Sequence, residues 1–193
     1  MVSDFNSALN TVKKVLALDF ACEEKDFNEE GVFIHEAREV RGRQRLPFRK
    51  KSLDLATMGI GVAVCCSTER LRWAKINLSQ LSRDDAFANP TIARMDRYVK
   101  RDGQFMAGPQ LKYICALDIF QPYTGDKEVQ IELVVDAKKL ELHNDKRFPN
   151  TVSHINNPLR VAAFATCNGE IASVAGANAD SDIMWQVGID TLQ

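Results

Sequence analysis

An Asn-Gly pair late in the chain, Asn168-Gly169, constrains the fold more than any other feature of the sequence. It is the strongest short signal for a two-residue β-hairpin, because a type I′ turn needs positive φ at both central positions. Two apolar stretches flank it, LRVAAFATC at 159–167 and EIASVAGANA at 170–179. A short loop, NADSD, then leads into SDIMWQVGIDTLQ, in which apolar and polar residues alternate. The sequence therefore predicts a meander of three antiparallel strands that ends at Gln193.

The middle strand of this meander is rich in small residues. They are Ala172, Ala175, Gly176 and Ala177. Small side chains within a strand indicate that another part of the chain approaches it closely. We therefore expect a tightly packed element against this strand.

The first two-thirds of the chain mixes helical and strand patterns. Apolar spacing predicts a helix over residues 4–18, and Asn89-Pro90 and Gly103 frame a second helix. A third helix, capped by Ser67 or Thr68, carries an apolar face. Strands are predicted in GVFIHEAREV, MGIGVAVCCS, LKYICALDIF and EVQIELVV.

These patterns predict an α/β fold of the α+β type, with a mixed, mostly antiparallel sheet and flanking helices. Residues 138–158, rich in Asn and charge, read as a short helix and a loop. We take this segment as the boundary between an N-terminal domain, 1–150, and a C-terminal one, 151–193.

Composition excludes several classes of partner and location. The 25 basic and 26 acidic residues give a net charge of -1, so no global field favours nucleic acid or a membrane. The longest apolar runs are much shorter than the roughly 20 residues of a membrane span, and the N-terminus lacks the pattern of a signal peptide. The five cysteines include no C-x-x-C pair, which favours reduced thiols and a cytoplasmic location.

The other motifs receive structural interpretations. The basic run at 41–51 is predicted to be a solvated loop beside the acidic stretch CEEKDFNEE, with binding of a polyanion as the alternative. Cys65 and Cys66 should point to opposite faces of a buried strand as structural thiols. No metal ligands are predicted, because three histidines lack ligand spacing: His35, His143 and His154.

One stretch resembles a known family. NGEIASVAGANADSDIMWQVGID is similar to the second, third and fourth strands of GNAT-superfamily N-acetyltransferases, specifically a bacterial branch with a long N-terminal domain. The early LDFACEEKDF resembles the start of that domain. The resemblance implies transfer of an acetyl group from acetyl-CoA to an amine. It also implies that backbone N–H groups of the fourth strand contact the thioester and pantetheine.

The resemblance assigns roles to four residues near the end of the chain. Ile189 and Thr191 match the positions whose backbone donors bind acetyl-CoA and polarise its carbonyl. Asp190 is the nearest candidate for a general base, and a carboxylate that hydrogen-bonds a local turn is the alternative. Trp185 is expected either to form a wall of the acceptor site or to be a core aromatic.

In the family, the fourth strand continues into an R-x-x-G-x-G loop that binds the pyrophosphate at a helix N-terminus. The 193 residues contain no such loop after Thr191, so the GNAT-like meander is expected to be incomplete and inactive alone. The alternative is a non-enzymatic module that forms a homo-oligomer through its exposed C-terminal strand edge.

Overall fold

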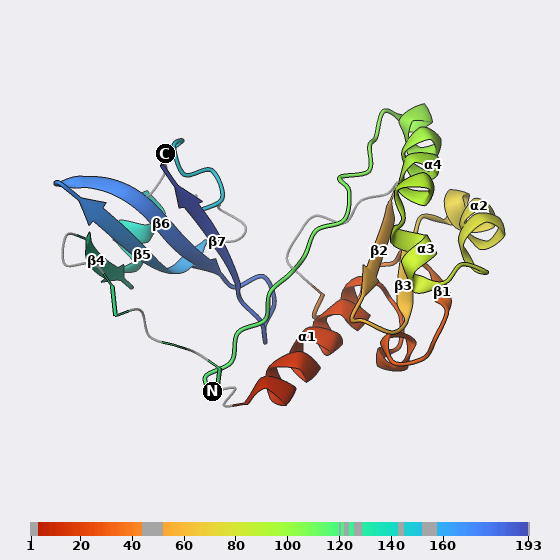
Figure 1. Ribbon diagram of the computed structural model, residues 1–193, viewed down its shortest axis with the longest axis horizontal. Helices are drawn as coiled ribbons and strands as arrows, with labels where there is room; N and C mark the ends of the chain where they lie inside the picture. The colour runs from red at the N-terminus through yellow and green to blue at the C-terminus, as the bar shows by residue number, and fades with distance from the viewer. Residues whose placement is uncertain are drawn as a thin grey trace. The chain divides into compact units, whose positions relative to one another are not determined.

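The structure, a computed structural model, forms two compact units (Figure 1). Unit 1 comprises residues 1–43 and 47–119, and unit 2 comprises 44–46 and 120–193. Helices accompany two sheets of three and four strands, which confirms the α+β fold class. The described residues are 4–43, 52–119, 121, 124–125, 129–142, 145–151 and 158–192.

Unit 1 is built on a three-stranded sheet in the order β1-β3-β2. β1 runs parallel to β3, and β2 runs antiparallel to it. The elements follow one another as α1 (Phe5–Asp19), the 3-10 helix η1 (Glu24–Phe27), β1 (Val32–Glu36), β2 (Leu53–Thr57), β3 (Val62–Cys66), α2 (Thr68–Leu78), α3 (Arg83–Phe87), α4 (Asn89–Val99) and the 3-10 helix η2 (Lys100–Asp102).

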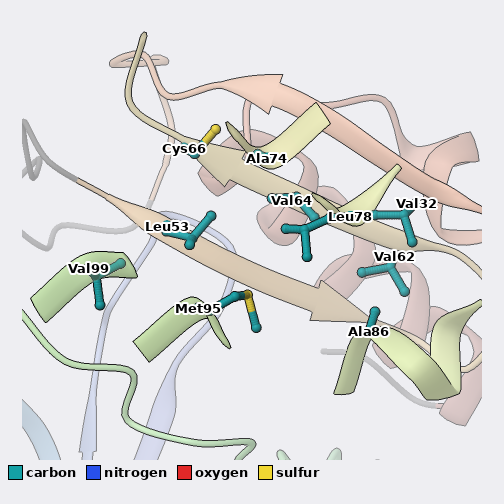
Figure 2. Packing of buried hydrophobic residues seen from close by; sticks show 10 residues of the cluster. All are labelled: Val32, Leu53, Val62, Val64, Cys66, Ala74, Leu78, Ala86, Met95 and Val99. Atoms are coloured by element: carbon teal, nitrogen blue, oxygen red, sulfur yellow. The ribbon is translucent and has the colours of Figure 1, made fainter. Parts of the chain in front are cut away.

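The central strand β3 is buried along its whole length. One face carries Val62, Val64 and Cys66, which pack with buried residues of α2, α3 and α4 (Figure 2). Ala63 faces the other way and packs with Phe27 and with residues of α1. Because successive side chains alternate, Cys65 and Cys66 lie on opposite faces, as the sequence predicted.

The helices of unit 1 follow their sequence signals. Asp4 caps α1 by accepting a hydrogen bond from the backbone N–H of Ser7 at 2.9 Å. α4 begins at Asn89 with Pro90 in its first turn, and Gly103, at φ 72°, ends the helical segment after η2. The strand predicted in LKYICALDIF is wrong for residues 111–119, which form no strand. Among the described residues, no neighbouring strand offers its backbone for pairing with this segment.

Unit 2 is a four-stranded antiparallel sheet in the order β4-β5-β6-β7 (Figure 1). Asn168 and Gly169 both have positive φ, 52° and 83°, which confirms the predicted hairpin. The sheet begins well before the boundary predicted at 150, because the segment before α5 pairs with β5. The elements are β4 (Val129–Val134), α5 (Ala137–Leu142), β5 (Leu159–Cys167), β6 (Glu170–Asn178) and β7 (Gln186–Thr191).

The two faces of this sheet differ. One face packs Val134, Ala162 and Val174 against Leu140 of α5 and Phe148. The side chains that alternate with these form the open face, where four large apolar residues are 59–67% exposed: Ile131, Leu133, Val187 and Ile189. Within the described ranges, no helix combines the length and apolar character needed to cross a membrane.

Candidate functional site

The backbone of β7 presents polar groups at the edge of the sheet. Leu192 donates its N–H to the carbonyl of Ala172 at 2.8 Å, which marks a hydrogen-bonded position. In an antiparallel pair such positions alternate with non-hydrogen-bonded ones. Because Leu192 is hydrogen-bonded to β6, the register of the pair makes Thr191, Ile189 and Val187 the non-hydrogen-bonded positions of β7. Their N–H and C=O groups therefore point away from β6, toward the open edge.

These outward backbone groups are regularly spaced, and contacts with β6 hold the end of the strand that carries them. Alternate residues of a strand are about 7 Å apart, so the edge offers a row of donors and acceptors at that interval. The Ser173 hydroxyl donates to the carbonyl of Asp190 at 2.8 Å and lies 3.0 Å from the Thr191 hydroxyl. The end of β7 is therefore tied to β6 by side-chain as well as backbone contacts.

The Asp190 side chain lies on the face of the sheet that packs against α5, whereas the side chains of the residues before and after it lie on the open face. Its carboxylate accepts the backbone N–H of Asn150 at 2.8 Å and the side-chain Nδ2 of Asn150 at 2.6 Å. Thr151 Oγ1 is 3.3 Å from the same carboxylate. We call these three residues the Asp190 latch. Asn150 lies 40 residues before Asp190, so these bonds are not the contacts to a local turn that were expected as the alternative role of Asp190. The general-base role stays a prediction.

Two glycines allow the latch segment to approach the sheet. A Cβ at Gly188 would collide with the carbonyl oxygen of Asn150 and lie 3.0 Å from its carbonyl carbon. A Cβ at Gly176 would lie 2.7 Å from a methyl of Leu159 and 3.3 Å from Cβ of Thr151. The close packing predicted from the small residues of the middle strand is confirmed at Gly176.

Trp185 lies just before β7 and is 55% exposed. A turn centred on Ser181 precedes it. The Ser181 hydroxyl accepts the N–H of Met184 at 3.0 Å, and the Ser181 N–H donates to the Met184 carbonyl at 3.2 Å. The indole is therefore a surface group at the entrance to β7 rather than a core aromatic.

Unit 1 contains a polar cluster that the sequence analysis missed. It consists of Cys22, Asp26 and His35, whose ligand-type atoms all lie within 4.8 Å of one another. His35 lies on β1 and Asp26 in η1, while Cys22 lies in the loop between α1 and η1. No spacing rule joins these positions, because the return of the chain through β1 creates the cluster. The other two histidines, His143 and His154, lie outside the described residues.

A basic and aromatic surface lies between α2 and α4. The rings of Trp73 and Tyr98 stack with centroids 4.2 Å apart. Arg94, Arg97 and Arg101 line the shallow pocket beside them. This surface arises from helix packing rather than from the basic run at 41–51, of which residues 44–51 lie outside the described ranges.

Comparison of the chain with family models, with curated proteins and with solved structures finds no match.

Proposed function

We propose that unit 2 provides the acetyl-CoA-binding strand of a GNAT-type N-acetyltransferase, which transfers an acetyl group to an amine. The observation that carries this proposal is the outward direction of the backbone N–H groups of Ile189 and Thr191. These are the two positions to which the resemblance assigns the backbone donors. The strand order also supports it, because β5, β6 and β7 are consecutive neighbours and β4 precedes them in the same sheet.

The edge of β7 fits the chemistry of the donor. Acetyl-CoA supplies the acetyl group as a thioester. The outward N–H groups are held by the β6 ladder on the other side of the strand, so they are oriented before any ligand binds. Val187 and Ile189, 62% and 64% exposed, add apolar surface next to them. Backbone donors beside apolar side chains suit an amide-containing, largely apolar arm such as pantetheine.

The remaining predicted residues have supporting positions. The Asp190 latch holds the end of β7 against the segment at 145–151, and this keeps the outward groups in place. Trp185 is exposed at the start of β7, where an acceptor wall would have to be accessible. All five cysteines are free thiols, which supports a cytoplasmic location.

Titration of the ¹⁵N-labelled chain with acetyl-CoA tests the proposal. We expect amide shifts concentrated at the outward positions Val187, Ile189 and Thr191. Ile189→Pro removes one outward donor without breaking the β6 ladder, since proline is tolerated at such edge positions. Ile189→Ala is the matched control, because it shortens the side chain and keeps the N–H. We expect the affinity to fall at least tenfold in the proline variant and to change less in the alanine variant.

Two results would overturn the proposal. One is an absence of β7 shifts at millimolar acetyl-CoA in the folded chain. The other is equal loss of affinity in Ile189→Pro and Ile189→Ala, which would assign the effect to the side chain alone.

Self-association through the same edge is the second candidate, and the exposed apolar side chains of β7 favour it. Among the described residues, no strand pairs with the outer edge of β7, and an edge of this kind with Val187 and Ile189 exposed is a template for pairing with a second copy. Sedimentation should then show a dimer that Ile189→Lys dissociates, since lysine blocks edge pairing. A monomer at several hundred micromolar would exclude this candidate.

A further inference from the structure

The cluster of Cys22, Asp26 and His35 in unit 1 combines three kinds of metal ligand. Nε2 of His35 lies 2.9 Å from Oδ2 of Asp26. Sγ of Cys22 completes a triangle in which no two ligand atoms are more than 4.8 Å apart. Sulfur, nitrogen and oxygen donors therefore converge on one point.

Backbone hydrogen bonds fix the positions of Cys22 and Asp26. Cys22 follows the end of α1, where its N–H donates to the carbonyl of Ala17 at 3.0 Å. Oδ2 of Asp26 accepts the N–H of Glu23 at 3.1 Å, which orients the carboxylate within η1. The carbonyl oxygen of Asp26 also rests against Gly61, where a Cβ would collide with it. The loop is thus fixed against the start of β3.

The polar groups of the cluster are shielded, and one lacks a hydrogen bond. The Asp26 side chain is 6% exposed and the His35 side chain 26% exposed. Nε2 of His35 is buried without a hydrogen bond, although a carboxylate oxygen is close by. Cys22 itself packs against the buried apolar cluster of Ala17, Phe27 and Ala63. A buried ring nitrogen and a carboxylate oxygen that face each other this closely can hold a proton or a cation between them.

We propose that unit 1 binds a zinc ion through Cys22 Sγ, the Asp26 carboxylate and His35 Nε2. Zinc binds these donors at about 2.0 to 2.3 Å, which places tetrahedral ligands about 3.5 Å apart. The observed separations, from 2.9 Å to at most 4.8 Å, bracket that value. A thiolate and an imidazole select zinc over magnesium or calcium, which prefer oxygen ligands. Three protein ligands leave the fourth tetrahedral position for water.

Metal binding changes the protonation of the cysteine. Burial, together with the nearby charge of Asp26, raises the pKa of the Cys22 thiol to about 12, so the metal-free residue is a thiol at neutral pH. Binding breaks the S–H bond, forms an S–Zn bond and releases one proton to the buffer; zinc stays divalent. A nucleophilic role for Cys22 fits less well, because Nε2 of His35 faces Asp26 and the thiol pKa is raised rather than lowered.

Titration of the full chain with Co²⁺ and Zn²⁺ tests the proposal. We expect one equivalent of Co²⁺ to give the visible bands of a tetrahedral site and a thiolate-to-cobalt charge-transfer band, both abolished by Zn²⁺. Cys22→Ser and His35→Gln should lower the zinc affinity by about a hundredfold or more, since loss of even an outer-shell partner costs 10- to 100-fold. Cys115→Ser is the matched control and should bind zinc like the parent chain, because Cys115 is an exposed thiol outside the cluster.

The parent chain alone can overturn the proposal. The absence of a thiolate band in folded protein, judged by circular dichroism, would do so whether or not the variants fold. Equal binding by the parent chain, Cys22→Ser and His35→Gln would assign the metal to surface groups instead. The readout is independent of acetyl-CoA, so the acetyltransferase proposal and the zinc site succeed or fail separately.

Discussion

The Asp190 latch yields a quantitative prediction through the exchange of the side chains at Asp190 and Asn150. In Asp190→Asn the carboxylate loses its charge but keeps its shape, and an amide flip at Asn150 restores complementary donors and acceptors. A hydrogen bond to a charged group contributes about 1 kcal/mol more than a neutral one. Two such bonds, at 2.8 and 2.6 Å, are affected. Because the latch is partly exposed, we expect a loss of about 1 to 2 kcal/mol in the free energy of unfolding.

The reciprocal change should be more harmful than the first. Asn150→Asp places two carboxylates about 3 Å apart, which costs about 1.5 kcal/mol in water and about 5 kcal/mol at an effective dielectric constant of 20. The double variant Asn150→Asp/Asp190→Asn restores an amide facing a carboxylate. We therefore expect it to be more stable than Asn150→Asp alone, with a coupling energy of about 1 to 3 kcal/mol.

Calorimetry and amide hydrogen exchange measure this cycle. A loss of 1 to 2 kcal/mol should lower the melting temperature of a unit of this size by about 4 to 16 °C. Exchange should quicken at the inward N–H groups of Gly188, Asp190 and Leu192 before it does elsewhere in unit 2. Additive single and double variants, with a coupling energy below about 0.5 kcal/mol, would show that the latch does not hold β7.

Three further predictions concern single positions. Gly188→Ala should destabilise unit 2 by about 2 to 4 kcal/mol in urea denaturation, since the added Cβ collides with backbone atoms. Gly176→Ala should destabilise it less, because the added Cβ collides with a Leu159 methyl, which can move. Ala21→Gly should stabilise unit 1 by about 0.5 to 1 kcal/mol in the same assay, because Ala21 has φ 50° and glycine relieves that strain. The hydrogen bond from the Ser7 backbone N–H lowers the pKa of Asp4. The stabilisation that the Asp4 carboxylate gives the fold is therefore present above the usual pKa of aspartate and is lost as the pH falls through its pKa in the folded protein. Asp4→Ala should therefore lower the melting temperature at pH 7 but not at pH 2.

If the β7 edge and the Cys22 cluster both bind their proposed ligands, the chain carries two independent sites. One site is made of backbone groups on a strand edge in unit 2. The other is made of side chains from three segments of unit 1. Their tests have different readouts, amide shifts for the first and a thiolate band for the second. Loss of one site by substitution should therefore leave the other unchanged, which a Cys22→Ser chain titrated with acetyl-CoA would verify.

Local sequence signals determined much of this fold. The Asn168-Gly169 turn, the helix cap at Asp4 and the apolar run of β3 each specify a conformation through contacts within a few residues. Such signals can be recognised without knowing what a segment packs against. The steric limits on φ, and the spacing of apolar residues along a helix or strand, depend only on nearby residues.

The tertiary structure decided which segments pair and which side chains meet. β2 was not predicted, because its short LDLAT pattern becomes a strand only beside β3, while the equally alternating 111–119 has no neighbouring strand among the described residues. Asp190 meets Asn150 across 40 residues, and His35 meets Asp26 only because β1 returns alongside β3. Pairing, burial and convergence depend on satisfying hydrogen bonds and apolar faces between distant segments, and no local pattern contains that information.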